Sequence, residues 1–377
     1  MKIVRSVKLH YCKWITDKKR NAIMTFLSEY SSVVNYFIAT YEEQVGELTR
    51  LQCQNSVLVS KCSDDTGTWL SANMIKSAFA EGYSMVHSAK SRVSSSNPYR
   101  SPNHKGRTAT LQRCNEQVNP TNISKFDFMV TLKGIGRRGS NIRLNIPLRK
   151  HAQFNKWDTL GRRSSVIRVS NSFIQFSFKI ETGEKKPPST NMLGVDTGIT
   201  HLATLSDGTH IGSDLRTLID QLTRKQFKSK AYYRKKTQIK QYINEQLKLI
   251  PFDQSSLIVV EKLKNLKKNM KVKRRLTKTI RRVVANWRYA HILSRIQALC
   301  EENRVVFRSV DPRNTSRTCN SCGHTSKKNR LSQSIFHCQS CGHSGNADIN
   351  ASRNILERFI LGQYGAEYQP FYSGTVN

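Results

Sequence analysis

The chain has 377 residues, of which 37% are hydrophobic and 8% aromatic, so it is long enough for two or three domains with their own cores. Its net charge of +36, from 62 basic and 26 acidic residues, is far above what solubility requires. This excess indicates a polyanionic partner, because each Lys or Arg that neutralises a phosphate releases a condensed counterion. A membrane partner is not expected, because no apolar run reaches the roughly 18 residues of a spanning helix.

The chain contains nine cysteines, an odd number, and its first residues, MKIVRSVKLHYCKW, hold no apolar stretch fit for a signal peptide. Both features favour a reducing compartment, so we expect a cytoplasmic protein. Five of the cysteines are scattered, and we interpret them as ordinary thiols: Cys12, Cys53, Cys62, Cys114 and Cys300.

The N-terminal half is predicted to be a small β-barrel with a helical insertion after its first strand. KIVRSVKLHY alternates as a strand does, and Thr16 and Asp17 then offer a cap for an amphipathic helix. A second helical stretch covers about Trp69 to His87, and a loop rich in Ser, Pro and Asn runs from Ser88 to Arg107. From Thr108 to Ile180 the pattern is that of short strands, the last two turning at Ser170-Asn171-Ser172.

The segment GIGRRG, Gly134 to Gly139, fits a G-x-G-x-x-G nucleotide-binding fingerprint on paper. That fingerprint needs a strand before it and a helix after it, whereas strand-like sequence lies on both sides here. We therefore predict a glycine-rich hairpin loop.

After a linker at Gly183 to Asn191, the C-terminal half alternates between strands and helices. NMLGVDTGIT is an apolar strand, and HLATLSDGTHIG is a hairpin that turns at Asp207-Gly208. A long basic helix is predicted from about Ser213 to Leu249, then the strand SSLIVVE, further basic helical sequence to about Asn303, and the strand RVVFRSV. This order predicts an α/β domain with a mixed sheet.

Three acids lie at the ends of predicted elements in this half: Asp196 in MLGVDTG, Glu261 after LIVV, and Asp348 at the start of the helix NADINASRNI. A charge at the mouth of a buried strand is costly unless it is paired or bound to a metal. Mg²⁺ takes carboxylate oxygens, and two such ions about 4 Å apart can activate water for phosphodiester cleavage. Each acid could instead be a satisfied cap or loop group, and spacing alone does not bring the three together.

Two Cys-x-x-Cys pairs, Cys319 with Cys322 and Cys338 with Cys341, are separated by 15 residues. This spacing is typical of a structural Cys₄ zinc ribbon, and we interpret His324 and His343 as knuckle residues. Because Asp348 follows only seven residues after Cys341, we expect the ribbon to interrupt the domain that carries the acids.

Basic residues are concentrated in two stretches, RKQFKSKAYYRKK and Lys262 to Arg288, of which the second holds twelve basic residues and no acid. Tyr232 and Tyr233 lie within the first stretch. Basic side chains with interleaved aromatics suit phosphate contact and base stacking, while the alternative is a solvated charged helix face.

The elements GVDTGITHLATLSDG, LIVVEKLKNL, TSRTCNSCG, FHCQSCG and NADINASRNI occur in this order, and together they resemble the TnpB family of transposon-associated RNA-guided nucleases, related to type V CRISPR effectors. The resemblance covers most of Met192 to Glu357. It implies a RuvC-like, RNase H-type fold whose catalytic acids, binding Mg²⁺, match Asp196, Glu261 and Asp348. The family's last motif commonly reads Asp-Arg-Asp, then Asn-Ala-Ala; here Asn346 and Ala347 precede Asp348, and Ser352 replaces the second Ala.

The fold class expected from the pattern and the resemblance is a multidomain α+β protein. Its domains would be a β-barrel wedge, a helical recognition insertion, a RuvC-like domain, a zinc ribbon that binds target nucleic acid, and a tail. The expected boundaries are 1–15 with 108–186 (wedge), 16–107 (insertion), 191–316 with 344–365 (RuvC-like), 317–343 (ribbon) and 366–377 (tail).

The resemblance implies an RNA-guided DNA endonuclease of a prokaryotic cytoplasm or nucleoid. It would act as a monomer on its guide RNA, with target DNA as substrate, structural Zn²⁺ and catalytic Mg²⁺. Two alternatives remain open at this point. One is an RNA-guided repressor that binds DNA without cutting it, and the other is a transposon-associated nuclease that needs no guide.

Overall fold

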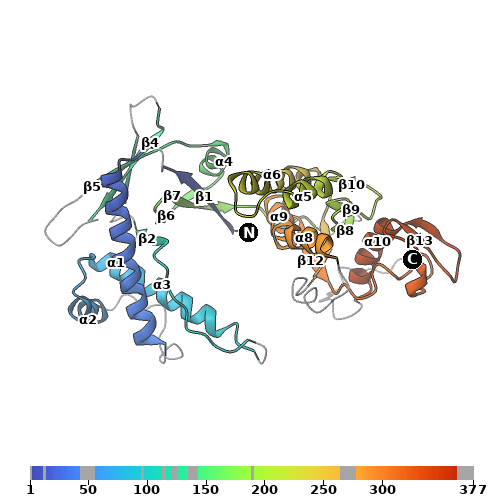
Figure 1. Cartoon of the computed structure of the whole chain (residues 1–377), viewed down its shortest axis with the longest axis horizontal. Coiled ribbons are helices and arrows are strands. Elements are labelled where there is room, and N and C mark those ends of the chain that lie inside the picture. The colour runs from blue at the N-terminus through green and yellow to red at the C-terminus, as the bar shows by residue number, and fades with distance from the viewer. Residues whose placement is uncertain are drawn as a thin grey trace. The chain divides into compact units, whose positions relative to one another are not determined.

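The computed structural model describes residues 2–11, 14–42, 56–94, 97–112, 116–120, 125–134, 143–187, 191–263 and 277–362. The chain divides into two compact units, one of Lys2–Glu181 and one of Met1 with Thr182–Asn377 (Figure 1). No helix in the described ranges is long and apolar enough to cross a bilayer. The predicted tail at 366–377 and the part of the basic stretch at 264–276 lie outside the described residues.

The first unit begins with strand β1 (Lys2–His10) and the predicted amphipathic helix α1 (Asp17–Tyr41). The backbone N–H of Lys19 donates to Thr16 Oγ1 at 3.4 Å, so the Thr16 cap is confirmed. Helix α3 (Ala72–Lys90) contains most of the second predicted helical stretch and packs on α1. Helix α2 (Ser56–Thr66) was not predicted.

The strands of this unit form two antiparallel sheets, in the orders β1-β7-β6-β2 and β3-β4-β5. No closed barrel is formed by the described strands, so that part of the predicted fold is wrong in detail. The physical reason is that, among the described residues, β3, β4 and β5 pair with one another and not with the strands of the other sheet. A short helix, α4, also enters the region predicted to hold strands alone. The elements are β2 (Thr108–Gln112), β3 (Glu116–Pro120), β4 (Phe128–Lys133), β5 (Arg143–Leu148), α4 (Ala152–Leu160), β6 (Arg162–Ser170) and β7 (Phe173–Glu181).

Two of the predicted turns in this unit have strands on both sides. Strands β6 and β7 pair antiparallel around Ser170-Asn171-Ser172, which confirms that hairpin. The GIGRRG segment follows β4 and precedes β5, which also pair antiparallel, as a hairpin loop requires. Residues 135–142 themselves lie outside the described part of the chain.

The second unit is built on a five-stranded mixed sheet in the order β10-β9-β8-β11-β12. Strands β8, β11 and β12 run parallel, and β9 and β10 continue from β8 as antiparallel neighbours. The predicted hairpin at Asp207-Gly208 is confirmed, with Gly208 at a φ of +99°. The strands are β8 (Met192–Asp196), β9 (Ala203–Leu205), β10 (His210–Ile211), β11 (Leu257–Glu261) and β12 (Val306–Val310).

Helices cover both faces of this sheet (Figure 1). Ile258 and Val260 of β11 belong to a core shared with α5 (Leu215–Thr223), α6 (Lys230–Gln246) and α9 (Tyr289–Glu302). Leu257 and Val259 point the opposite way, into a smaller core with Ile355 and Phe359 of helix α10 (Ala347–Ile360). The alternation of side chains along a strand therefore defines an α10 face of the sheet.

The predicted long basic helix is instead two helices, α5 and α6, separated by residues 224–229. Lys228 has a φ of +65°, a left-handed conformation that a continuous helix does not allow. Ser229 caps the new helix, because its Oγ accepts from the N–H of Tyr232 at 3.1 Å. The turn η3 (Leu247–Leu249) and helix α8 (Lys278–Asn286) follow before α9.

The cysteine segment leaves the sheet after β12 and returns at α10. It contains the turn η4 (Lys327–Asn329) and a small antiparallel pair, β13 (Ile335–His337) with β14 (Ser344–Asn346). Phe336, Ala347, Cys319 and Cys338 form a small core of its own. We call residues 317–346 the ribbon.

Candidate active site and metal centre

Asp196 and Glu261 are the last residues of two neighbouring parallel strands, β8 and β11. The register pairs Val195 with Val260, so the two acids occupy the next position on each strand. Val195 and Val260 belong to the core with α5, α6 and α9. Because side chains alternate, Asp196 and Glu261 both lie on the α10 face of the sheet.

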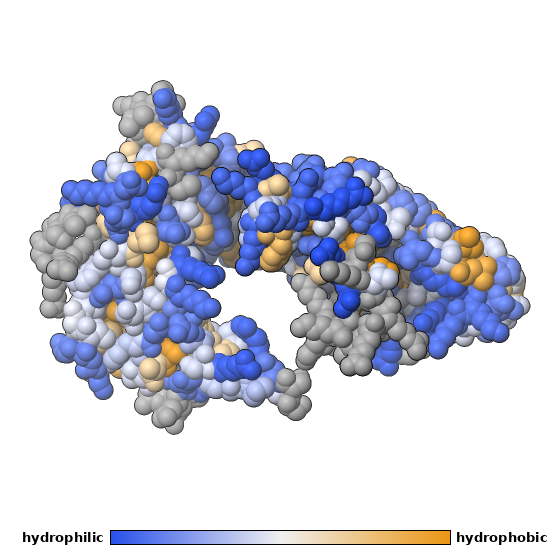
Figure 2. All heavy atoms as spheres, viewed as in Figure 1, coloured by the Kyte–Doolittle hydropathy of each residue, from blue (hydrophilic) through white to orange (hydrophobic). Residues whose placement is uncertain are grey.

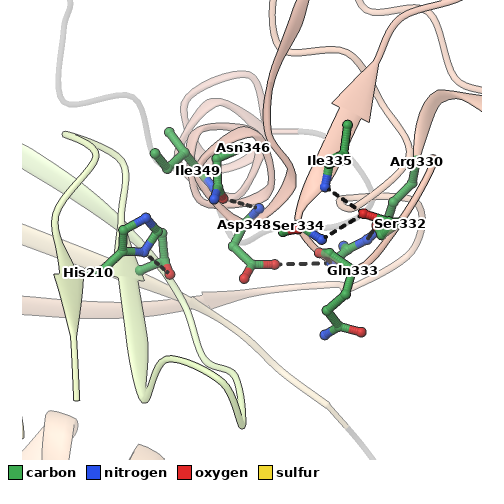
Figure 3. A network of polar contacts seen from close by, with 10 residues as sticks. His210, Arg330, Ser332, Gln333, Ser334, Ile335, Asn346, Asp348 and Ile349 are labelled. Carbon is green, nitrogen blue, oxygen red and sulfur yellow. Dashed lines mark hydrogen bonds and ion pairs between the residues drawn. The ribbon is translucent and has the colours of Figure 1, made fainter. Parts of the chain in front are cut away.

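Asp348 lies in the first turn of α10, which packs on that face. The side chain of Asn346 caps the helix, since its Oδ1 accepts from the N–H groups of Asp348 at 2.9 Å and Ile349 at 3.1 Å (Figure 3). The helix approaches β8 closely, because a Cβ at Gly194 would lie 2.0 Å from the carbonyl oxygen of Ser352. Ser352 is itself fully buried, so position 352 also requires a small side chain.

The three acids share one electrostatic environment. Burial raises the pKa of Asp196 to about 8, and the negative charges of Glu261 and Asp348 contribute to the shift, while Arg330 opposes it. Burial likewise raises the pKa of Tyr289 to about 12, with contributions from Glu261 and Asp196. Mutual charge effects of this kind require that the three carboxylates be neighbours.

Glu261 is held by groups that the sequence did not single out. Thr315 Oγ1 donates a hydrogen bond to Glu261 Oε1, and the Tyr289 hydroxyl donates to the backbone oxygen of Glu261. Burial raises the pKa of Glu261, while the hydrogen bond from Thr315 and the charge of Arg358 oppose the shift. Glu261 thus lies at the end of β11, and Thr315, in the loop that leads into the ribbon, fixes the orientation of its carboxylate.

Arg330 of the ribbon reaches into the acidic site, where its NH2 atom lies 3.0 Å from Asp348 Oδ1 (Figure 3). Both side chains are largely shielded, with 23% and 17% of their surfaces exposed. The same nitrogen donates to the backbone oxygen of Gln333 at 2.6 Å, which fixes its direction. Arg330 was not predicted as a site residue, because nothing in KKNRLS distinguishes it from its basic neighbours.

The donor chemistry of the acids fits hard divalent cations, which prefer carboxylate oxygens. Among the described residues, however, only the four cysteines form a group of three or more His, Cys, Asp or Glu residues whose ligand atoms all lie within 4.8 Å of one another. The three carboxylates are therefore neighbours that do not close around one point.

The four predicted cysteine ligands do converge. Cys319 Sγ lies 3.8 Å from Cys341 Sγ, and Cys322 Sγ lies 3.6 Å from Cys338 Sγ. Thiolates bound tetrahedrally at 2.3 Å from zinc would be about 3.8 Å apart. Backbone N–H groups of Cys341 and Ser340 lower the pKa of Cys338 to about 6, whereas the neighbouring cysteines raise the pKa of Cys322 to about 12 against a hydrogen bond from the backbone of His324. The cluster therefore fits a structural metal ion such as zinc.

One buried asparagine, Asn329, joins the two knuckles of the ribbon. Its Nδ2 donates to the backbone oxygens of Arg317 and His324, both at 3.0 Å, and its Oδ1 accepts from the N–H of Gln339 at 3.0 Å. The side chains of Asn350 and Asn354 on α10 donate to the backbone oxygen of Thr318 at 2.8 and 2.6 Å. These bonds tie the ribbon to the helix that carries Asp348.

The surface near the start of α6 is basic and aromatic. Residues 224–240 include eight Lys or Arg and no acid. Phe227 and Tyr233 are 70% and 53% exposed, whereas Tyr232 is buried. Figure 2 shows that hydrophilic residues cover most of the visible surface, with hydrophobic residues in small groups. Such a surface suits nucleic-acid phosphates and unpaired bases.

A family model and a solved structure indicate to which class of protein the chain is similar. The family model described as the Cas12f1-like TNB domain matches residues 289–355, a range that begins at α9 and includes the four cysteines and Asp348. The solved structure of a Cas12f1–sgRNA–target DNA complex covers 94% of this chain and 98% of that chain, with a TM-score of 0.62 and 13% sequence identity. The chain thus has the mixed α/β multidomain fold of the Cas12f type.

Two curated relatives are similar to this chain in sequence. InsQ of Escherichia coli (strain K12), provisionally named an RNA-guided DNA endonuclease, is 32% identical over 227 residues, which are 50% of this chain and 55% of InsQ. A TnpB-like protein of Aquifex aeolicus is 32% identical over 100 residues, which are 26% of this chain and 31% of that relative. The match therefore spans about half the length of InsQ. The resemblance to the TnpB family is confirmed by these similarities.

Proposed function

We propose that the protein is an RNA-guided DNA endonuclease that hydrolyses target DNA at the Asp196, Glu261 and Asp348 site. The observation that carries the proposal is the meeting of two strand-end acids with the first turn of α10 on one face of the sheet. The names of InsQ and of the Cas12f1–sgRNA–target DNA complex support the same activity and the same partners.

In this proposal Asp196, Glu261 and Asp348 would hold Mg²⁺, which when bound would supply an activated water and neutralise charge on the phosphate. Thr315 would hold Glu261 by its Oε1 atom and so fix the direction in which the carboxylate faces the metal. Asp196, whose pKa is raised, would lose its proton when it binds the metal. Arg330 lies beside Asp348 and offers its guanidinium to the negative charge that develops on the scissile phosphate.

The remaining parts have roles that follow from their charge and shape. The four cysteines would bind structural Zn²⁺ and keep Arg330 at the site. We further propose that the unit of Lys2–Glu181 comprises the wedge and the recognition insertion, and that guide RNA binds the basic surfaces. Base pairing with the guide would then supply the sequence specificity.

The test is co-expression with RNA from the flanking locus, followed by cleavage of a plasmid that carries a matching target. Asp196→Ala and Glu261→Ala should each abolish Mg²⁺-dependent cutting while the guide RNA still copurifies. Cutting that persists in both variants would reject the site. Guide binding without any cutting by the unaltered protein would favour an RNA-guided repressor, and cutting that survives RNase treatment would favour a guide-independent nuclease.

A further inference from the structure

A row of polar side chains crosses the sheet at the level of the acids. Asp196 of β8 lies opposite Thr204 of β9, and Thr204 lies opposite His210 of β10. Directly opposite residues of antiparallel strands place their side chains on the same face. Ile211, the neighbour of His210, belongs to the core on the other face. His210 therefore lies on the α10 face, two strands from Asp196.

His210 is held in a defined orientation. Its Nδ1 lies 3.1 Å from Thr204 Oγ1, and its ring stacks on that of His201, with centroids 4.3 Å apart and planes inclined by 27°. The His210 side chain lies on the side of the hairpin that faces Asp348 (Figure 3), and the charge of Asp348 acts on its pKa. His210 remains exposed, so its second nitrogen, Nε2, is available to a ligand.

The surroundings favour a hydrogen on Nε2. When the Thr204 hydroxyl donates to Nδ1, the neutral ring carries its hydrogen on Nε2. Burial and the neighbouring His201 lower the pKa of His210, while Asp348 opposes the shift, so the neutral donor form is favoured near neutrality.

We propose that His210 is a positioning residue that binds a backbone phosphate flanking the scissile phosphate, by donating a hydrogen bond from Nε2. This inference rests on the function proposed above. Strands lie about 4.8 Å apart, so His210 is about 10 Å along the row from Asp196. His210 would therefore fix where the strand leaves the site and which phosphodiester reaches the acids.

The test compares three variants of the guide-loaded protein. His210→Phe keeps a flat ring for stacking on His201 but has no donor, His210→Gln keeps a donor, and Thr209→Ala changes an exposed neighbour as a control. We expect His210→Phe to raise KM about tenfold or more with a much smaller change in kcat, since a hydrogen bond to a charged group contributes about 1.5–3 kcal/mol. His210→Gln should recover most of that loss, and Thr209→Ala should behave as the unaltered protein.

A second measurement locates the contact. Single methylphosphonate substitutions, placed in turn at phosphates flanking the cut, remove one negative charge each, and target binding is measured in the Asp196→Ala background. One substitution should weaken binding by the His210 protein but not by the His210→Phe protein, as for partners in a double-mutant cycle. If His210→Phe matches the unaltered protein in KM and at every phosphate, the inference is overturned while cleavage stands. Failure of the unaltered protein to cut would instead count against the proposed function.

Discussion

At the scale of single residues, the site depends on placing acids where water cannot fully solvate them. Asp196 follows buried Val195, and Glu261 follows four buried apolar residues, Leu257–Val260. Each of these carboxylates is therefore partly desolvated, and burial raises the pKa of both. The two acids also contribute to the raised pKa of the nearby Tyr289 hydroxyl. A divalent cation would relieve the repulsion between the carboxylates, which is the physical reason for proposing metal binding at the three acids.

The raised pKa of Asp196 predicts how stability depends on pH. Its folded pKa is about 8 and its ordinary value is 3.8, so between these pH values the folded protein binds more protons than the unfolded chain. Stability should therefore fall as pH rises from about 4 to about 8. The measurement is the melting temperature across this range without added Mg²⁺ and without a chelator, so that the metal proposed for the cysteines stays bound. Asp196→Asn should flatten the slope, and Mg²⁺ should stabilise the protein more at pH 8 than at pH 6. An identical slope in Asp196→Asn would contradict the assignment.

At the scale of elements, the close packing of α10 on β8 sets the position of Asp348. Gly194 lets the helix backbone approach, and Asn346 fixes the helix start. The ribbon between β12 and α10 is held to that helix at two places, because Asn350 and Asn354 donate to Thr318 near its start while Arg330, in its middle, binds Asp348. The ribbon can thus be an insertion in the sequence and still contribute a side chain to the site.

The variant Gly194→Ala tests this packing. A Cβ at this position would lie 2.0 Å from Ser352 O and 3.0 Å from Leu356 Cβ, so α10 must shift. We expect a loss of about 2–3 kcal/mol in the free energy of unfolding, as for other overpacked cores. Cleavage should fall further than stability explains, because Asp348 moves with the helix. Gly345→Ala is the matched control, since the nearest atom to its Cβ is 3.9 Å away. Equal stability of the two variants would argue against the close contact.

Sequence patterns predicted the elements whose signal is local. The strands that carry Asp196 and Glu261, the Asp207-Gly208 turn and the Thr16 cap each follow from a few adjacent residues, and the cysteine spacing predicted a cluster that the structure contains. Arg330 could not be predicted in the same way, because its partner lies 18 residues away and is reached only through the fold. The break at Lys228 was missed because a lysine gives no local signal for a positive φ.

At the scale of the whole molecule, the excess of positive charge favours a polyanionic partner. The net charge of +36 is carried by a chain that divides into two compact units, and self-repulsion at this density opposes compaction. A nucleic acid that neutralises the basic surfaces would relieve this repulsion in both units. In the proposed function, basic surfaces such as residues 224–240 would bind the partner chiefly through phosphates, with Phe227 and Tyr233 exposed for stacking.

Binding of the copurifying nucleic acid should therefore depend steeply on salt. If 6–10 phosphates are contacted, affinity should fall about 10³- to 10⁵-fold between 50 and 200 mM salt. Replacing Lys225, Lys228, Lys230 and Arg234 by Ala should reduce the slope of log K against log salt by about 0.7–0.9 for each lost contact. Lys248→Ala, an exposed lysine beyond α6, serves as the control and should leave the slope nearly unchanged. A slope that the fourfold variant does not alter would place the phosphate contacts elsewhere on the molecule, because only residues that neutralise phosphates release counterions.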